Sequence, residues 1–117
     1  MRVIVTGSRR WADETAVYEA LLAVHAEHGP IHLMHRACST GADYYADLWY
    51  RLVGEALGCT EMKYPAAWEA HGRAAGPIRN KRMVEAGADL VLAFPLPEGS
   101  GTQGTIRLAE AAGIEVK

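Results

Sequence analysis

Short apolar segments that are typical of buried strands alternate with helical patterns from one end of the chain to the other. The strand-like segments are residues 2–5, 31–34, 60–64, 88–94 and 114–116. Helical periodicity fills the intervals, at about residues 14–28, 41–57, 77–86 and 102–112. Because strands separated by helices usually run parallel, this alternation predicts a parallel sheet with helices on both faces. We therefore expect an α/β fold, namely a Rossmann-like three-layer α/β/α sandwich whose mostly parallel five-stranded sheet has the order 3-2-1-4-5.

The length and charge of the chain limit the class of protein. Its 117 residues suit one domain, so we expect a single domain over residues 1–117. The formal net charge of −2 gives no reason to expect nucleic acid or an anionic membrane as a partner. No apolar run approaches the roughly 20 residues that span a bilayer. Met1 leads directly into a strand rather than a signal peptide, which predicts a cytoplasmic location.

The cysteines and histidines do not indicate a metal centre. Cys38 and Cys59 are expected to be reduced thiols. No Cys/His spacing resembles a structural zinc site. His25 and His28 lie one turn apart on a predicted helix, where solvent exposure is the expected state. We therefore expect neither a metal nor a bound cofactor.

Glycine-containing turns follow three of the predicted strands, at residues 6–9, 39–43 and 98–102. In a parallel α/β sheet, such turns emerge on one edge, where ligands bind outside the carboxyl ends of the strands. Glycine lets the backbone approach a ligand closely, and the helix N-terminus beyond it favours an anion. The three turns together predict a site for a phosphate-bearing nucleotide or a related molecule.

Polar side chains in these turns match that chemistry. Ser8 offers a hydroxyl, and Arg9 offers a bidentate donor for phosphate or carboxylate. Asp43 either complements the helix dipole or accepts hydrogen bonds from a ribose or base. Ser100 and Thr102, with the backbone N–H groups of their turn, can cradle a phosphate.

A dense polar segment precedes the fourth strand, at residues 71–82. Arg79 and Asn80 are expected in the first turn of a helix that begins near Pro77, from which they can reach the crevice. A solvated basic helix face is the alternative. Trp68 either stacks on a base or covers the core, as Trp11 and Trp49 are expected to do.

Two common nucleotide-binding motifs are missing from the sequence. It contains neither G-x-G-x-x-G nor G-x-x-x-x-G-K-[ST], which weakens the hypotheses of an NAD dehydrogenase and of a P-loop protein. The ordered set of short motifs instead resembles the SLOG superfamily, Rossmann-like domains related to the LOG-type phosphoribohydrolases and to the DNA-processing protein DprA. Within it, the chain is most similar to the YspA-like, cpYpsA-related group. The segments that carry the resemblance are residues 5–9, 40–46, 68–72, 75–80 and 101–102.

The resemblance implies a nucleotide or nucleotide-derived ligand, for example one of the ADP-ribose type, that the domain senses or processes. It places Gly7 and Ser8 on the floor of the site, Asp43 against ribose, and Arg79 against phosphate or ribose. It also implies a homo-oligomer, for which the apolar helix at residues 41–57 offers one face. The expected site residues are Gly7, Ser8, Arg9, Gly41, Asp43, Arg79, Asn80, Gly99, Ser100, Gly101 and Thr102.

Two departures from the LOG-type motifs bear on catalysis. Asn80 replaces the lysine of R-K-x-x-M, and Thr105 stands where P-G-G-x-G-T-x-x-E has its glutamate. A threonine cannot supply the negative charge that stabilises a cationic ribose. An N-glycosidic hydrolase of nucleoside monophosphates, with Arg79 as a catalytic residue, therefore needs another carboxylate such as Asp43 or Glu98. A DNA-associated module like DprA is the third hypothesis, and the acidic net charge counts against it.

Overall fold

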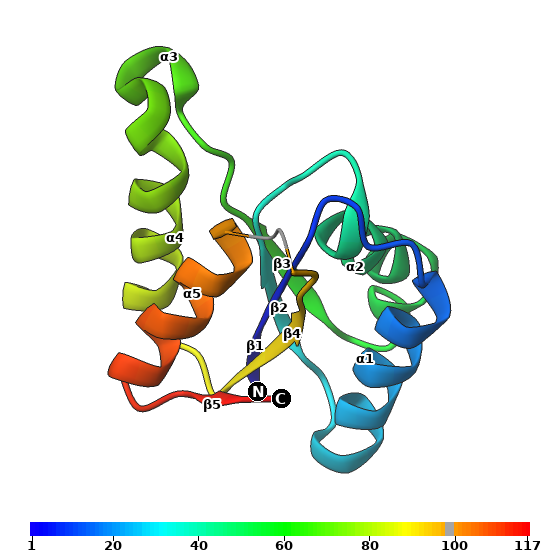
Figure 1. The fold of residues 1–117 in the computed structure, drawn as a ribbon. Helices are drawn as coiled ribbons and strands as arrows, with labels where there is room; N and C mark the ends of the chain where they lie inside the picture. The colour runs from blue at the N-terminus through cyan, green and yellow to red at the C-terminus, as the bar shows by residue number, and fades with distance from the viewer. Residues whose placement is uncertain (98–99) are drawn as a thin grey trace.

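In a computed structural model of the chain, the five strands form one parallel sheet in the predicted order β3-β2-β1-β4-β5 (Figure 1). The structure describes residues 1–97 and 100–117, with Ser100 described by its backbone alone. The strands are β1 (Arg2–Gly7), β2 (His32–His35), β3 (Thr60–Lys63), β4 (Leu90–Phe94) and β5 (Glu115–Val116). The chain runs outward from β1 through β2 to β3 and then crosses back to β4 on the other side of β1. The order of the strands therefore reverses between β1 and β4, which leaves a topological switch point at the carboxyl ends of these two central strands.

Helices cover both faces of the sheet, which confirms the Rossmann-like α/β prediction (Figure 1). The helices are α1 (Glu14–His28), α2 (Gly41–Trp49), α3 (Trp68–His71), α4 (Ala75–Glu85) and α5 (Ser100–Ala111), with a π-helical turn η1 (Tyr50–Gly54) and a 3-10 turn η2 (Gly72–Ala74). The helices α1 and α2 lie on one side of the sheet, and α4 and α5 lie on the other. None of the helices in the described ranges has the length and apolar character needed to cross a membrane.

Side chains of β1 divide the core into two layers, because alternate residues of a strand point to opposite faces. Val3 and Val5 join the cluster that contains Leu21 of α1 and Trp49 of α2. Ile4 joins the smaller cluster with Met83 and Val84 of α4 and Ala109 of α5. The central strands β1, β2 and β4 are therefore buried on both faces, as the apolar character of β1 predicts, whereas the edge strand β3 is largely exposed.

The ends of α1 follow the sequence signals. Asp13 is the N-cap, and its Oδ1 accepts a hydrogen bond from the backbone N–H of Ala16 at 3.0 Å. Gly29 ends the helix with a φ of 81°, and its N–H donates to the carbonyl oxygen of His25 at 2.8 Å.

The prediction of one long apolar helix at residues 41–57 is only partly confirmed. The α-helix ends at Trp49 and continues as the wider turn η1. The indole ring of Trp49 occupies the space beside Gly54, where an added Cβ would lie 2.6 Å from it. Leu52 and Val53 lie within this wider turn, and both side chains are exposed rather than buried against the sheet.

The segment before β4 also differs from the prediction. Residues 65–75, for which the sequence pattern predicts neither a strand nor a helix, contain the short helix α3 and the turn η2. The next helix, α4, begins at Ala75 rather than near Pro77, so Arg79 lies in its second turn. A helix as short as α3 has no periodicity that a sequence pattern can reveal.

Candidate functional site

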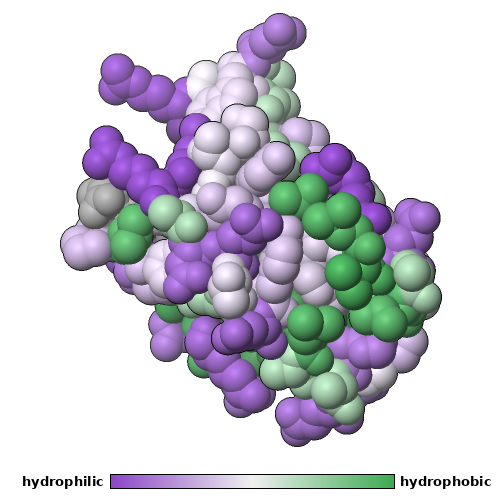
Figure 2. Space-filling view, turned by 90° about the vertical axis from the view of Figure 1, so that its right-hand side faces the viewer, coloured by the Kyte–Doolittle hydropathy of each residue, from purple (hydrophilic) through white to green (hydrophobic). Residues whose placement is uncertain are grey.

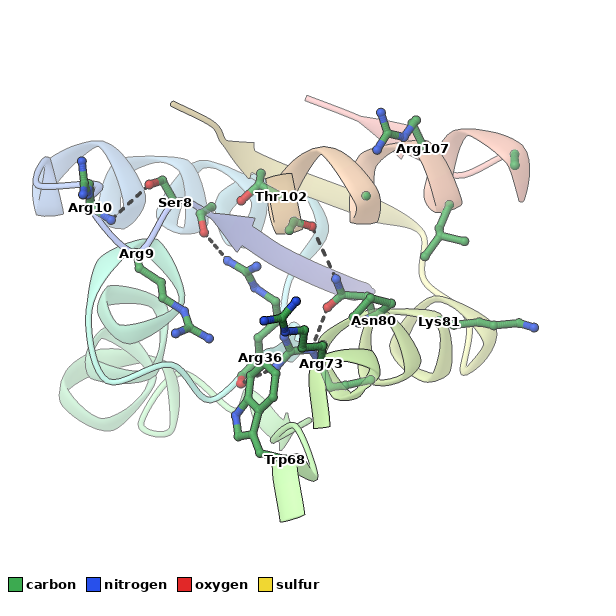
Figure 3. Close-up of a pocket in the computed structure, with 18 residues that line it drawn as sticks. Ser8, Arg9, Arg10, Arg36, Trp68, Arg73, Asn80, Lys81, Thr102 and Arg107 are labelled. Carbon is green, nitrogen blue, oxygen red and sulfur yellow. Dashed lines mark hydrogen bonds between the residues drawn. The ribbon is translucent and has the colours of Figure 1, made fainter. Parts of the chain in front are cut away.

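A cleft of about 1170 Å³ lies at the carboxyl edge of the sheet, where the ends of β1 and β2 meet the helices α4 and α5. Its walls come from the loop after β1, from Arg36 after β2, from the α3–α4 segment and from α5. The cleft is therefore at the switch point between β1 and β4, where the fold predicts a ligand. Figure 3 shows this cleft with the side chains that line it.

The N-terminus of α5 forms one wall of the cleft. Gly101 and Thr102 line it, and Thr102 is 1% exposed. A Cβ on Gly101 would lie 3.1 Å from Nη1 of Arg36, so the absence of a side chain leaves room for that guanidinium group. A helix N-terminus beside a guanidinium group is a favourable place for a phosphate or carboxylate.

Arg36 is held in place by Asp43 at the start of α2. Its Nη2 donates to Oδ1 at 2.9 Å, and its Nε donates to Oδ2 at 3.1 Å. The backbone N–H of Arg36 also donates to Oδ2 of Asp43, at 2.8 Å, and Nη2 donates to the carbonyl oxygen of Gly7. Burial by itself lowers the pKa of Arg36, but the charge and hydrogen bonds of Asp43 outweigh it and raise that pKa.

Sequence reasoning missed Arg36 as a site residue. The signal was present, because this arginine directly follows β2 at its carboxyl end, as Arg9 follows β1. Its guanidinium group lines the cleft, whereas the carboxylate of Asp43 is 1% exposed and lies outside the lining. Asp43 therefore positions Arg36 in the structure and does not face the cleft.

Arg79 of α4 reaches the cleft from the opposite layer and is 7% exposed. Its Nε donates to Oδ1 of Asn80 at 2.7 Å, and its Nη1 donates to the carbonyl oxygens of Arg36 at 3.2 Å and Tyr64 at 3.3 Å. Burial, followed by the charge of Arg36, lowers the pKa of Arg79. No carboxylate of the described residues forms an ion pair with this buried guanidinium group.

Asn80 connects Arg79 to the α5 wall. While its Oδ1 accepts from Arg79, its Nδ2 donates to the carbonyl oxygen of Gly101 at 3.4 Å. The amide thus bridges two helices that converge on the cleft, as the dashed lines in Figure 3 show. The structure brings Arg79, Asn80, Gly101 and Thr102 together, as the sequence predicts.

The loop after β1 forms the floor. Gly7 and Ser8 line the cleft, and Ser8 is fixed by its N–H, which donates to the carbonyl oxygen of Phe94 at 3.1 Å. Gly41, which was expected to bind the ligand, lies behind this loop and outside the lining. Its φ is +80°, and a Cβ there would overlap the carbonyl oxygen of Ser8 and lie 2.6 Å from Cα of Arg9. Gly41 therefore allows the start of α2 to pack against the floor.

Two further predicted residues fall at the limit of what the structure describes. Gly99 lies outside the described residues, as does the side chain of Ser100. Glu98, the alternative carboxylate of the hydrolase hypothesis, lies outside them as well. Thr105, at the position of the LOG-type glutamate, is fully buried and donates from Oγ1 to the carbonyl oxygen of Gly101 at 3.3 Å.

Basic side chains dominate the lining. The basic residues that line the cleft are Arg9, Arg10, Arg36, Arg73, Arg79, Lys81 and Arg107, seven of the twelve Lys and Arg residues of the chain. Within the described ranges, no Asp or Glu lines it. An acidic protein thus carries a strongly cationic cleft, a feature that the net charge conceals.

Trp68 lies at the rim of the same cleft, beside Arg73 in the view of Figure 3. It is 51% exposed, unlike Trp49, which is fully buried, and Trp11, whose ring packs against Phe94 at a centroid distance of 5.4 Å. The expectation that Trp11 and Trp49 serve the core is therefore confirmed, and Trp68 has a large aromatic face left open.

A second polar cluster lies between β2, β3 and α2. Nε2 of His35 is 3.0 Å from Oε2 of Glu61, and Asp47 lies beside both. The backbone N–H of Ala37 donates to Nδ1 of His35, so the proton of the neutral ring is on Nε2. That tautomer suits a hydrogen bond to Glu61 rather than a metal ligand. Lys63 also lies against Asp47, at 3.4 Å, so the cluster is an ion-pair network.

The sequence profile of a family described as "YspA, cpYpsA-related SLOG family" matches residues 1–71. The chain belongs to this SLOG family. It is also 43% identical to "Gene 61 protein" of Mycobacterium phage D29, over 98% of this chain and 93% of the phage protein. Membership of the SLOG family indicates a nucleotide-related ligand-binding or processing role. The matched residues include the cleft floor and the Arg36–Asp43 pair, and α4 and α5 lie beyond them.

Proposed function

We propose that the cleft binds a nucleotide or a nucleotide-derived small molecule, for example one of the ADP-ribose type, and that the domain senses or processes this ligand. The observation that carries the proposal is Arg79, a buried guanidinium group that lines the cleft without a carboxylate partner among the described residues. A buried charge is costly unless it is paired, so an anion in the cleft would stabilise it. SLOG membership supports a nucleotide as the source of that anion.

The phosphate subsite of this proposal is the N-terminus of α5. Gly101 and Thr102, in the first turn of the helix, line it, and Nη1 of Arg36 lies beside Gly101. Arg79 contributes a second guanidinium group from α4. This combination of a helix N-terminus and bidentate donors is suited to phosphate.

The base subsite of the proposal is the open face of Trp68. Aromatic stacking of a base on a tryptophan contributes about 1–3 kcal/mol and tolerates any base. The exposure of this ring at the rim of the cleft supports that role. Substitution of Trp68 by alanine should weaken nucleotide binding, and substitution by phenylalanine should preserve most of it.

The geometry supports ligand binding better than N-glycosidic hydrolysis. Of the carboxylates considered for hydrolysis, Asp43 is engaged by Arg36 and is outside the cleft lining. Thr105 is buried at the position of the LOG-type glutamate. The binding proposal requires neither residue to act on the ligand.

A thermal-shift screen of the purified protein against nucleosides, nucleotides, ADP-ribose and NAD tests the proposal. A ligand at a hundred times its Kd should raise the free energy of unfolding by about 2.7 kcal/mol. Product analysis of each hit then separates binding from processing, because an intact ligand supports a sensor and free base supports a hydrolase. Absence of a shift with every nucleotide, or a shift that survives in both Arg79→Lys and Thr102→Val, contradicts the proposed site.

We propose further that the partner of this domain in solution is a second copy of the chain. Figure 2 looks onto the face that carries α1 and α2, and it shows apolar side chains gathered on one side of that face. The exposed apolar residues of these elements include Leu22 on α1, Leu52 and Val53 on η1, and Leu57. Light scattering after gel filtration should give a mass above that of the 12.7 kDa monomer, and Leu52→Lys should lower it.

A further inference from the structure

The number of unpaired positive charges in the cleft bears on the class of ligand. Arg36 is already neutralised by Asp43, Lys81 lies 3.8 Å from Glu85, and Arg10 has an interaction of its own. The remaining four cationic residues, Arg9, Arg73, Arg79 and Arg107, form no ion pair within the described part of the chain. Among the described residues, the cleft therefore has an excess of about four positive charges.

These arginines do not converge on one point. In Figure 3, Arg9 lies at one end of the cleft and Arg107 at the other, with Arg36 and Arg73 between them. They come from separate elements, the loop after β1, the turn η2, and the helices α4 and α5. The cleft volume of about 1170 Å³ is also larger than the roughly 300–1000 Å³ of most small-molecule sites. A single phosphate at the N-terminus of α5 would leave one or both ends of this cleft without a counter-charge.

We propose that the ligand of this cleft is a nucleotide with at least two phosphate groups, such as a nucleoside diphosphate or a pyrophosphate-linked nucleotide. One terminal phosphate carries about −1.5 to −2 charges at neutral pH, roughly half of the unpaired positive charge. A second phosphate extends the anion along the cleft, toward the arginines at its ends. This inference rests on the proposed function and narrows it to a class of nucleotide.

The buried position of Arg79 distinguishes the cleft from an ordinary basic surface. Arg9, Arg73 and Arg107 are exposed and keep much of their water, whereas Arg79 is 7% exposed and has lost most of its own. Arg36 and Arg9 lie close enough to add repulsion, and together with burial they lower the pKa of Arg79. A polyanion relieves this repulsion for several arginines at once, so its affinity should rise with each added phosphate.

Calorimetric titration at fixed ionic strength with adenosine, AMP, ADP and ADP-ribose tests the inference. We expect ADP and ADP-ribose to bind at least tenfold more tightly than AMP. The double variant Arg9→Ala/Arg107→Ala removes charges at both ends of the cleft and leaves Arg36, Arg79 and the α5 N-terminus in place. It should bring the affinity for ADP to within about threefold of that for AMP, while AMP binding stays close to that of the wild type.

The matched control is Arg82→Ala/Lys117→Ala, which removes the same charge from exposed residues outside the cleft. It should preserve the preference for ADP. Equal affinities for AMP and ADP in the wild type, or equal losses for both in the Arg9/Arg107 variant, overturn the inference but leave nucleotide binding standing. A single-stranded oligonucleotide that binds more tightly than ADP also overturns it, in favour of a nucleic-acid site. Failure of all nucleotides to bind instead contradicts the proposed function itself.

Discussion

Arg36 and Asp43 form a two-point ion pair beneath the cleft, with Nη2–Oδ1 at 2.9 Å and Nε–Oδ2 at 3.1 Å. Both side chains are more than nine-tenths buried. Asp43 also accepts the backbone N–H of Arg36, so one carboxylate fixes both the loop after β2 and the guanidinium group that it carries. The start of α2 is thereby connected to the N-terminus of α5, where Nη1 of Arg36 lies next to Gly101.

Substitution of Asp43 by asparagine should therefore affect both stability and binding. It keeps the size of the side chain but leaves the charge of Arg36 buried without a partner. Removing one member of a buried ion pair costs about 3–5 kcal/mol, so we expect the free energy of unfolding to fall by about 3 kcal/mol in urea titration. A loss below about 0.5 kcal/mol, as is usual for surface changes, would show that the pair does not hold the loop.

Gly41 and Gly29 offer a matched pair for measuring how closely α2 packs on the floor of the cleft. Their φ angles are +80° and +81°, in a region that L side chains rarely adopt, so alanine is strained at both. An added Cβ meets nothing within 4 Å at Gly29, whereas at Gly41 it overlaps the backbone of Ser8 and Arg9. Gly29→Ala should cost about 1–3 kcal/mol of the free energy of unfolding, because a φ of 81° with a ψ of −155° is a conformation that glycine adopts far more readily than alanine. Gly41→Ala should cost about 1–3 kcal/mol more, because the backbone must move.

Chemical denaturation of both variants checks this prediction. If both alanine variants lose the same free energy of unfolding, the loop after β1 moves easily to accommodate the added Cβ. The floor of the cleft is then not held in place by α2. The Gly41→Ala variant should also bind nucleotide more weakly, whereas Gly29→Ala, at the far end of α1, should bind as the wild type does.

The cluster of Glu61, Asp47 and His35 predicts a dependence of stability on pH. Burial, followed by the hydrogen bond with Asp47, raises the pKa of Glu61. Burial alone would raise the pKa of Asp47 as well, but the hydrogen bond from Glu61 and the charge of Lys63 lower it. Arg51 lies on the other side of Asp47, at 3.2 Å. The pair therefore holds one proton, on Glu61, at pH values where both acids of the unfolded chain are ionised.

The folded protein then binds more protons than the unfolded chain above about pH 4.5, the ordinary pKa of glutamic acid. The contribution of Glu61 to the free energy of unfolding is fully present below that pH. It is lost as the pH rises through the raised pKa of Glu61. The lowered pKa of Asp47 acts in the opposite direction, since its contribution is lost as the pH falls below about 3.8. The Glu61→Gln variant has no such proton to lose. Its free energy of unfolding should therefore rise relative to the wild type between about pH 4.5 and the raised pKa.

Urea titrations of the wild type and Glu61→Gln from pH 4 to 7 measure this difference, with Glu19→Gln on the exposed side of α1 as the control. A difference that stays constant over the range would show that Glu61 does not retain its proton on folding.

The sheet order and the location of the cleft were predictable because both follow from chain-wide patterns. Alternating strands and helices with right-handed crossovers leave few topologies, and glycine turns after parallel strands must meet at one edge. Thr102 and Asn80 were predicted as site residues from their expected positions at that edge. The role of Asp43 was not, because it depends on which side chain reaches the carboxylate after the turn closes. Arg36 and Asp43 are seven residues apart, and no sequence pattern indicates that these two side chains pair.

The cationic cleft was hidden from the sequence for a different reason. Its seven basic residues are spread over the chain from Arg9 to Arg107, and only folding gathers them. Net charge averages them with acids that lie elsewhere, such as Asp47 on α2 and Glu61 on β3. Composition therefore excludes a uniformly basic surface but carries no information about a local concentration of charge.

Asn80→Asp tests whether Arg79 binds the ligand through its charge. The new carboxylate keeps the acceptor for Nε of Arg79 but supplies the missing counter-charge and loses the donor to Gly101. We expect the pKa of Arg79 to rise, and phosphate to compete poorly with the internal carboxylate. Nucleotide affinity should fall at least tenfold in calorimetric titration. Arg82→Gln lowers the net charge equally from the same helix, outside the cleft, and should change affinity by less than threefold. Wild-type affinity in the Asn80→Asp variant would show that Arg79 supports the fold rather than the ligand.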